Sequence, residues 1–370
     1  MLKIAFKTFL SRIPFENNSS TNFFLFPLCF AESIKEIIFL TQLNICKFEI
    51  MIKAGIVGVG HLGEIHLKLI IQSELFKLIG FYDTNVDRAK FISKKYNVDY
   101  YENYEDMSNN IDCVIICTPT LFHFDIAKFF LNNHKHVFIE KPITNNLNQA
   151  NELVKIKNEN KLIGQVGHVE RFNGAFIEVE KILNPMFIES HRLSHYPARG
   201  TDVSVVLDLM IHDIDIVLSI VNSKVKNLSA NGTKIISSSP DIANARIEFY
   251  NGCVANLTAS RLSLKKMRKM RVFQSDSYIS IDFDKSRSEI VQITDYDKKN
   301  KYAMTLHNSD GKEKEIKIKT LENLDVNSII EEHNDFALSI NTNKSPKVSF
   351  EIGRDALELA FKILEKIDSK

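Results

Sequence analysis

The chain has 370 residues, of which 44% are apolar and 25% charged, a balance that is ordinary for a globular protein with a well-buried core. A formal net charge of +1 gives no support to a nucleic-acid partner, and the apolar run at 23–30 is too short to cross a membrane. The five cysteines show neither metal-ligand spacing nor an even disulfide framework, so we expect no metal site and a cytoplasmic location.

The first fifty residues differ in pattern from the rest of the chain. They lack the longer apolar region and the small-residue cleavage site of a signal peptide. The regular pattern of strands begins only at Ile52, and a domain of alternating strands and helices usually begins with its first strand. We therefore expect Met51 to be the natural start and residues 1–50 to be a poorly ordered or spurious extension, with a targeting role as the alternative.

From Ile52 onward, apolar runs that are typical of strands alternate with segments of helical periodicity. Strands are expected at 52–57, 78–82, 113–117, 137–139 and 162–166, and helices at 62–71, 87–95, 124–131 and 148–158. Strands that are apolar along their whole length favour a parallel sheet covered on both faces. The pattern predicts an α/β domain with a doubly wound parallel sheet over residues 51–170.

The pattern changes after about Asn173. A strong helix is expected at 206–221, and the alternating segments that follow are separated by turn signals. These signals predict one hairpin through Asn251-Gly252 and a second through 308–311, and two helices close the chain at 328–340 and 353–367. The second half, 171–370, is therefore predicted to be an α+β domain with a largely antiparallel sheet that is open on one face.

A glycine motif directly follows the first expected strand and opens a helix. In Gly58-Val59-Gly60-His61-Leu62-Gly63, Gly58 permits a tight turn, Gly60 lets a pyrophosphate approach the backbone, and Gly63 allows close packing of helix and strand. The pyrophosphate would lie at the helix N-terminus, against unpaired amides and the positive end of the helix dipole. His61 and Leu62 are expected to contribute to this site through their backbone.

Asp83 lies at the end of the second expected strand, twenty residues after Gly63. A carboxylate at this position bonds a ribose 2′-hydroxyl and repels a 2′-phosphate, so the sequence favours NAD over NADP. Arg88 leaves NADP as the less favoured cofactor. The structural alternative for Asp83 is a solvated turn residue or a helix cap.

Three further motifs follow the later strands and the strong helix. They are Cys117-Thr118-Pro119-Thr120-Leu121-Phe122-His123, Glu140-Lys141-Pro142 and Asp208-Leu209-Met210-Ile211-His212-Asp213-Ile214-Asp215. With the glycine loop, they resemble the Gfo/Idh/MocA family, named for glucose–fructose oxidoreductase, inositol dehydrogenase and a rhizopine catabolism protein. The resemblance runs from Ile52 to the C-terminus and implies a Rossmann domain followed by an α+β domain. The open sheet of that second domain often mediates oligomer contacts, which implies a homodimer or homotetramer.

By this resemblance, Lys141 lies near the nicotinamide and the reacting hydroxyl, and Asp208 and His212 complete the catalytic site. Asp208, His212 and Asp215 are spaced i, i+4 and i+7, which places them on one face of a helix. A histidine titrates in the range of a useful base, and a lysine can stabilise a developing alkoxide. Whether Lys141 or His212 carries the proton stays open. The alternative for Asp208 and His212 is a polar helix face bonded to nearby backbone.

Other cofactor contacts are expected around the same loops. Thr118 and Pro119 would shape the nicotinamide side of the pocket. His123 either belongs to the cofactor site or only begins a helix, and Glu140 either contacts a cofactor ribose or ends its strand.

A narrower resemblance concerns the substrate. Gly167-His168-Val169-Glu170-Arg171-Phe172-Asn173, Tyr196-Pro197-Ala198-Arg199-Gly200 and 207–213 look like the nucleotide-sugar branch of the family, with a departure at Gly174, where a proline is common. In that branch a UDP-N-acetylglucosamine 3-dehydrogenase makes a 3-keto sugar, and a PLP-dependent aminotransferase consumes it. The resemblance implies that the substrate is contacted by His168, Arg171, Tyr196, Arg199, Asp208 and His212.

Several alternatives remain open at this point. Arg171 and Arg199 can equally be structural ion-pair partners, and the basic run 265–271 is better explained as a solvated sheet edge or hairpin than as a phosphate site. The substrate can instead be inositol, a free sugar or UDP-N-acetylglucosaminuronate. A non-catalytic NAD-binding regulatory protein and an enoyl or bilin-type reductase are the alternatives of another class.

Overall fold

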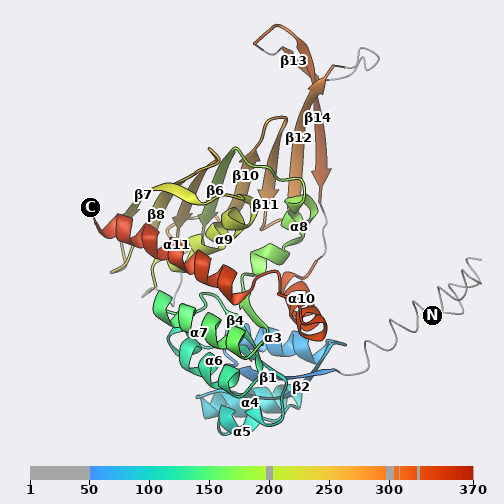
Figure 1. Ribbon diagram of the computed structural model, residues 1–370, viewed down its shortest axis with the longest axis vertical. Coiled ribbons are helices and arrows are strands. Elements are labelled where there is room, and N and C mark those ends of the chain that lie inside the picture. Colours follow the sequence, from blue (N-terminus) through green and yellow to red (C-terminus); the bar gives the residue numbers. More distant parts are fainter. Residues whose placement is uncertain (1–50, 197–202, 297–303, 308, 323–325, 370) are drawn as a thin grey trace, which may run out of the picture. The chain divides into compact units, whose positions relative to one another are not determined.

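The structure is a computed structural model that describes residues 51–196, 203–296, 304–307, 309–322 and 326–369 (Figure 1). The expected extension at 1–50 and the candidate substrate residue Arg199 lie outside the described residues. Residues 52–370 form one compact unit. No helix in the described part of the chain is long and apolar enough to span a membrane.

The first sheet has five parallel strands in the order β2-β1-β3-β4-β5. Its strands are β1 Ile52–Val57, β2 Phe76–Tyr82, β3 Cys113–Ile116, β4 His136–Glu140 and β5 Gly164–Gly167. Because the strands are parallel, their carboxyl ends meet at one edge, with Val57 paired to both Tyr82 and Ile116. This edge is where ligands bind in open α/β sheets.

Helices cover both faces of this sheet, as predicted. They are α3 His61–Ile71, α4 Val86–Tyr96, α5 Tyr104–Ser108, α6 His123–Asn132 and α7 Leu147–Glu159. Alternate strand residues are buried in separate clusters: Ile115 packs with residues of α3 and α4, whereas Val114 and Ile116 pack with residues of α6 and α7. The predicted α/β Rossmann architecture is confirmed.

The second sheet has nine strands in the order β13-β14-β12-β11-β10-β6-β9-β8-β7. They are β6 Phe187–Leu193, β7 Val225–Thr233, β8 Ile242–Phe249, β9 Val254–Ser260, β10 Met267–Phe273, β11 Ser277–Asp282, β12 Arg287–Asp295, β13 Met304–His307 and β14 Glu313–Leu321. All neighbours are antiparallel except β6 and β9. The hairpin expected at Asn251-Gly252 joins β8 to β9, with Gly252 at φ 88°.

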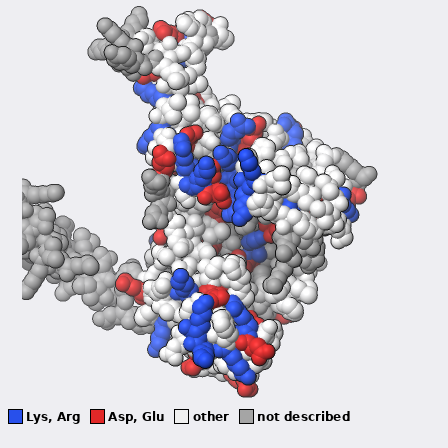
Figure 2. Space-filling model, turned by 180° about the vertical axis from the view of Figure 1, so that it is seen from behind, with Lys and Arg blue, Asp and Glu red and all other residues white. Residues whose placement is uncertain are grey.

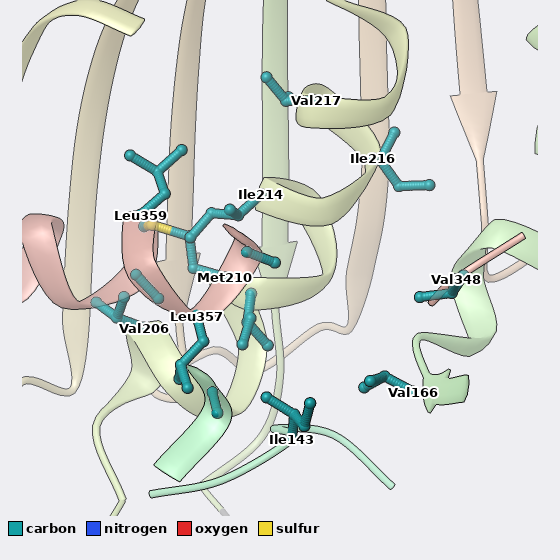
Figure 3. Close-up of a cluster of buried hydrophobic side chains, with 14 of the residues drawn as sticks. Ile143, Val166, Val206, Met210, Ile214, Ile216, Val217, Val348, Leu357 and Leu359 are labelled. Carbon is teal, nitrogen blue, oxygen red and sulfur yellow. The ribbon is translucent and has the colours of Figure 1, made fainter. Parts of the chain in front are cut away.

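Helices cover one face of this sheet (Figure 1): α8 Gly174–Glu180, α9 Ile211–Ile220 and α11 Phe350–Asp368. The helix predicted at 206–221 differs from the prediction, because its first turn, Val206–Met210, is a π-helix that precedes α9. Figure 3 shows Met210 and Ile214 pointing towards Leu359 of α11 in the buried cluster that fixes this turn. Single π turns are frequent at functional sites.

The end of the chain returns to the first sheet. In α10, Ser328–Thr342, Phe336 packs into the same cluster as Phe138 of β4. In α11, Gly353 lies so close to β5 that an added Cβ would be 2.5 Å from Val166. Two short 3-10 segments, Thr120–Phe122 and Val169–Phe172, follow β3 and β5. The two sheets are therefore held together by the last two helices.

Candidate active site

The glycine loop has the geometry that a dinucleotide requires. Gly58 has φ 89°, and an added Cβ on Gly63 would lie 1.9 Å from the Gly58 carbonyl oxygen. Apart from Gly60 and its two neighbours in the chain, no described atom lies within 4 Å of the Cβ position of Gly60, and no described side chain caps the N-terminus of α3. The first-turn amides thus face open space, which fits the pyrophosphate of a nicotinamide dinucleotide.

Asp83 is tied to this loop. Its Oδ2 accepts the Val59 N–H at 2.8 Å, and its Oδ1 accepts the Asn85 N–H at 2.8 Å. The side chain of Asn85, rather than that of Asp83, caps α4 by accepting the Arg88 N–H. Each carboxylate oxygen keeps further acceptor capacity, so Asp83 can hold the loop and still bind ribose hydroxyls.

Arg88 lies under the same loop and is already engaged. Its Nε donates to the Val59 carbonyl at 2.9 Å, and its Nη2 donates to Glu64 at 2.6 Å. Hydrogen bonds from Lys95, Arg88 and Tyr96 lower the pKa of Glu64 to about 2, so this carboxylate is charged at neutral pH. The guanidinium of Arg88 therefore stabilises the backbone of the glycine loop.

A cavity of about 440 Å³ opens at the carboxyl ends of β1, β2 and β3. Gly58, Gly60 and Asp83 line it on one side, and Thr118 and Pro119 on the other. Further lining residues are Val57, Tyr82, Thr84, Tyr104, Cys117, Phe122, Asp125 and Ile126. The cavity thus brings together five of the expected cofactor residues, whereas the expected His61, Leu62 and Gly63 are not among its described lining residues.

His123 takes a different position from the one a cofactor contact would need. It is buried, with Nδ1 2.9 Å from the Pro142 carbonyl oxygen and Nε2 2.8 Å from the Thr118 carbonyl oxygen. Burial lowers the pKa of this imidazole. His123 joins the loop after β3 to the loop after β4, and this supports the alternative of a structural role at the start of α6.

A second cavity, of about 220 Å³, lies where β4 and β5 end. The expected residues Leu62, Glu140, Lys141 and His212 line it. The other lining residues are Gly167, Val169, Glu170, Arg192, Leu209, Arg268 and Ile329. Since Gly60 lines the first cavity and Leu62 the second, the N-terminus of α3 lies between the two.

Lys141 is held in this second cavity by the π turn. Its Nζ donates to the Asp208 backbone oxygen at 2.7 Å and to Oδ1 at 3.1 Å. Both side chains are partly exposed, 20% for Lys141 and 38% for Asp208, so the ammonium is fixed in direction yet accessible to a ligand. The structure thus brings together Lys141 and Asp208, two of the residues that the motifs singled out, and their catalytic role stays a prediction.

Two histidines approach each other beside Lys141. The rings of His168 and His212 are 6.2 Å apart, and among the described residues neither His168 nitrogen nor His212 Nδ1 has a hydrogen-bond partner. Burial, followed by the charges of Lys141 and Arg171, lowers the pKa of His168 to about 3, and burial with Lys141 also lowers that of His212. Both rings are neutral at pH 7 and can accept a hydrogen bond from a hydroxyl.

The remaining predicted residues lie elsewhere. Arg171 is buried, with Nη1 3.4 Å from Asp215 and Nη2 4.0 Å from Glu180, and it is not among the described residues that line either cavity. Asp215 therefore does not share the site of Asp208 and His212, contrary to the one-face prediction, because it turns into the core towards Arg171. Tyr196 is exposed and bonds Ser237 at 3.0 Å.

Sequence reasoning missed a buried ion network at the cavity wall. Arg192 of β6 donates to Asp213 at 2.9 Å and to Glu170 at 2.7 Å, and it is 2% exposed. The only signal was the position of Asp213 beside His212. No group of described His, Cys, Asp or Glu side chains is arranged to hold a metal ion.

The basic run on β10 divides between the two faces of the sheet. Lys269 and Arg271 lie on the open face, paired with Asp282 and Glu189, and Figure 2 shows Lys and Arg interspersed with Asp and Glu there. The solvated face agrees with the prediction, but the predicted sheet edge is wrong, because β10 lies inside the sheet between β11 and β6. Arg268 points to the other face, lines the second cavity, and has Nη1 3.6 Å from Glu170 while remaining 48% exposed.

Comparisons with known proteins agree with this geometry. Residues 52–168 match the Gfo/Idh/MocA oxidoreductase family, NAD-binding Rossmann fold, and residues 161–280 match the Gfo/Idh/MocA C-terminal domain. A UDP-N-acetylglucosamine 3-dehydrogenase of Acidithiobacillus ferrooxidans is 32% identical over 236 residues, which cover 63% of this chain and 75% of the relative. A solved structure of that enzyme superposes with a TM-score of 0.78 at 26% identity, covering 86% of this chain and 99% of the other. A myo-inositol 2-dehydrogenase of Thermotoga maritima is 24% identical over 341 residues, which cover 86% of this chain and 97% of the relative.

Proposed function

The chain belongs to the Gfo/Idh/MocA family of NAD-binding oxidoreductases, and on that basis we propose that it oxidises C3 of a nucleotide sugar such as UDP-N-acetylglucosamine. The observation that carries the proposal is the Lys141 ammonium, which Asp208 holds in the same cavity as neutral His212. The wider statement, an oxidoreductase with a nicotinamide cofactor, does not depend on the sugar.

We propose that the cofactor is NAD, with NADP disfavoured. The glycine loop would bind the pyrophosphate, and Asp83 would bind the adenosine ribose in the cavity of about 440 Å³. A 2′-phosphate would meet the Asp83 carboxylate there. Arg88, the nearby cation, is already bound to Glu64 at 2.6 Å and to the loop carbonyls, which supports the preference for NAD.

Oxidation of a hydroxyl requires two protein groups beside it, one to stabilise the negative charge that develops on oxygen and one to accept the proton. A nicotinamide dinucleotide held by the glycine loop and Asp83 would supply the hydride acceptor. Lys141 stabilises the negative charge that develops on the oxygen, and Asp208 keeps the ammonium aimed at that point. The hydroxyl proton passes to Lys141 or His212, and either assignment is compatible with the geometry. The ring nitrogens of His168 have no hydrogen-bond partner among the described residues, so His168 can also accept a hydrogen bond from a substrate hydroxyl.

Arg268 supports a substrate that carries an anionic group. The neighbouring Arg192 is neutralised by two carboxylates, whereas Arg268 makes one long contact of 3.6 Å, with Glu170, among the described carboxylates and is half exposed at the cavity. Its guanidinium can bind a diphosphate through two parallel hydrogen bonds. We infer that Arg268, together with Arg199 outside the described residues, binds the diphosphate.

The assembly and the metabolic partner belong to the same proposal. We propose a homodimer or homotetramer and a PLP-dependent aminotransferase that consumes the keto product. The strands β12 to β14 carry exposed Ile293, Met304 and Ile318, an apolar surface that suits contact between subunits.

The test is the absorbance of reduced nicotinamide with purified protein, NAD or NADP, and a panel of UDP-N-acetylglucosamine, its uronate, inositols and free sugars. Glutamate and an aminotransferase draw off the keto product. Reduction of NAD with the nucleotide sugar supports the proposal. Reduction only with an inositol or a free sugar rejects the nucleotide sugar, and NAD binding with no reduction by any compound points to a regulatory protein.

A further inference from the structure

Three ionisable side chains form a continuous hydrogen-bonded chain behind the second cavity. Glu140 Oε1 is 2.9 Å from His66 Nε2, and His66 Nδ1 is 2.8 Å from His333 Nε2. The three come from β4, α3 and α10, which are far apart in the sequence. All are buried, with exposed fractions of 8% for Glu140, 0% for His66 and 2% for His333.

The two ends of this chain reach different cavities. Glu140 lines the second cavity together with Lys141 and His212. His333 lines a cavity of about 270 Å³ between the end of α3 and α10. The polar residues of that cavity are Gln72, Ser73, Glu74 and Asn334. Figure 1 shows α10 lying next to α3, the two helices that carry His333 and His66.

The side chains around Glu140, His66 and His333 are mostly apolar and offer few competing hydrogen-bond partners. The ring of Phe138 is 5.6 Å from that of His66 and 6.1 Å from that of His333, and Phe76 is 6.3 Å from His333. Gly167 makes room for the carboxylate, since an added Cβ there would lie 2.8 Å from Glu140. Burial and the charge of Glu140 raise the pKa of Glu332 well above its usual range, so that acid stays neutral.

A chain of this kind can transfer a proton by exchanging tautomers. With a charged Glu140, His66 donates from Nε2 to Glu140 and accepts at Nδ1 from His333. In the opposite arrangement Glu140 is protonated, and His66 and His333 each carry their proton on Nδ1. Glu140 then donates its proton to His66 Nε2, the Nδ1 proton of His66 moves to His333 Nε2, and the Nδ1 proton of His333 leaves at the outer end. Every hydrogen bond then reverses, and one proton has crossed the chain.

We propose that Glu140, His66 and His333 carry the proton of the oxidised hydroxyl from the second cavity to solvent. The inference rests on the proposed function, in which a hydroxyl becomes a ketone and loses a hydride from carbon and one proton from oxygen. The proton leaves through Lys141 or His212, reaches Glu140 within their shared cavity, and exits at His333.

The kinetic test uses two substitutions at the outer end. His333→Phe keeps a ring packed beside Phe76 and Phe138 but cannot carry a proton. Turnover should fall at least tenfold with KM unchanged, and a pH indicator should report proton release after NAD reduction instead of with it. His333→Ala should be equally slow and should recover as imidazole is added. The matched control Phe336→Leu should show neither change. Simultaneous proton release at the wild-type rate in His333→Phe would overturn the proposal.

A second measurement needs no substrate and therefore separates this inference from the proposed function. Ring ¹⁵N shifts in the NMR spectrum report which nitrogen of His66 and His333 carries the proton. Glu140→Leu removes the acceptor that fixes the tautomer of His66, and the tautomer of His333 should change with it. An unchanged His333 would show that the three groups are not coupled and would overturn the route, even if no sugar reduced NAD.

Discussion

Lys141 and Asp208 are 67 residues apart in the sequence, yet the Lys141 ammonium lies 2.7 Å from the Asp208 backbone oxygen and 3.1 Å from its carboxylate. The backbone bond matters because it depends on the π turn and not on the identity of residue 208. The ammonium is thus aimed by the main chain and tuned by the carboxylate. In the proposed function, one lysine after β4 and the turn before α9 would define the reacting position.

Removing the Lys141 ammonium should abolish most of the turnover and leave cofactor binding intact. Lys141→Met is expected to lower kcat by roughly 10²- to 10³-fold, the effect of losing one donor to a developing oxyanion. The NAD dissociation constant from calorimetry should stay within about twofold. Lys90→Met, at an exposed position on α4, is the control. Wild-type kcat in the Lys141 variant would remove this residue from the chemistry.

The glycine loop offers a pair of substitutions with different outcomes. Gly63→Ala should destabilise the fold, because its Cβ would lie 1.9 Å from the Gly58 carbonyl oxygen. Gly60→Ala should leave the thermal midpoint near wild type, since no described atom beyond its two chain neighbours lies within 4 Å of its Cβ, but should weaken NAD by occupying the pyrophosphate position. Thermal unfolding and calorimetry separate the two. Tight NAD binding by Gly60→Ala would place the pyrophosphate elsewhere.

Arg268 should distinguish a nucleotide sugar from a free sugar. Arg268→Leu is expected to raise KM for UDP-N-acetylglucosamine by about tenfold or more, the loss of a bidentate ionic contact, and to leave KM for an uncharged sugar unchanged. Lys269→Met on the open face of the same strand is the control. Equal increases in KM for both kinds of substrate would argue that Arg268 only supports the cavity wall.

His168 should make stability fall as the solution is acidified. Its folded pKa of about 3 lies below the value near 6.5 expected when unfolded, so the unfolded chain binds the extra proton and stability is lost as pH falls below 6.5. Between pH 6.5 and pH 5 this loss amounts to roughly 2 kcal/mol. Urea midpoints at pH 7 and pH 5 should differ less for His168→Gln than for wild type. The burial of Asp215, which raises its pKa to about 7, acts in the opposite direction and is common to both proteins.

Local patterns predicted those parts of the protein that are formed locally. The glycine loop, the strand after it and the hairpin at Asn251-Gly252 each depend on neighbouring residues, and all are present. The π turn was not predictable, because the periodicity of its apolar residues does not distinguish it from an α-helix. The exact bounds of the two domains stay a prediction, since α10 and α11 pack against the first sheet.

The residues whose roles the sequence did not predict were missed for a different reason, because those roles depend on distant parts of the chain. Arg192 acquires its role from carboxylates on two other elements, and His66 from a histidine 267 residues away, so neither pairing leaves a motif. Arg268 faces the cavity because of the register of β10, and a shift of one residue would have placed Lys269 there instead. Arg171 lies in a predicted substrate motif but is paired with Asp215, which agrees with the structural alternative for this arginine; the sequence did not identify the partner.

The return of the last two helices to the first sheet also has a consequence for synthesis. Phe336 and Phe350 fill the core around β4 and β5, yet they are translated long after those strands. Until α10 and α11 have been synthesised, the apolar surface around β4 and β5 that they cover is therefore exposed. Such contacts between distant segments slow folding and expose the chain to aggregation, so chaperone demand should be high until the C-terminus emerges.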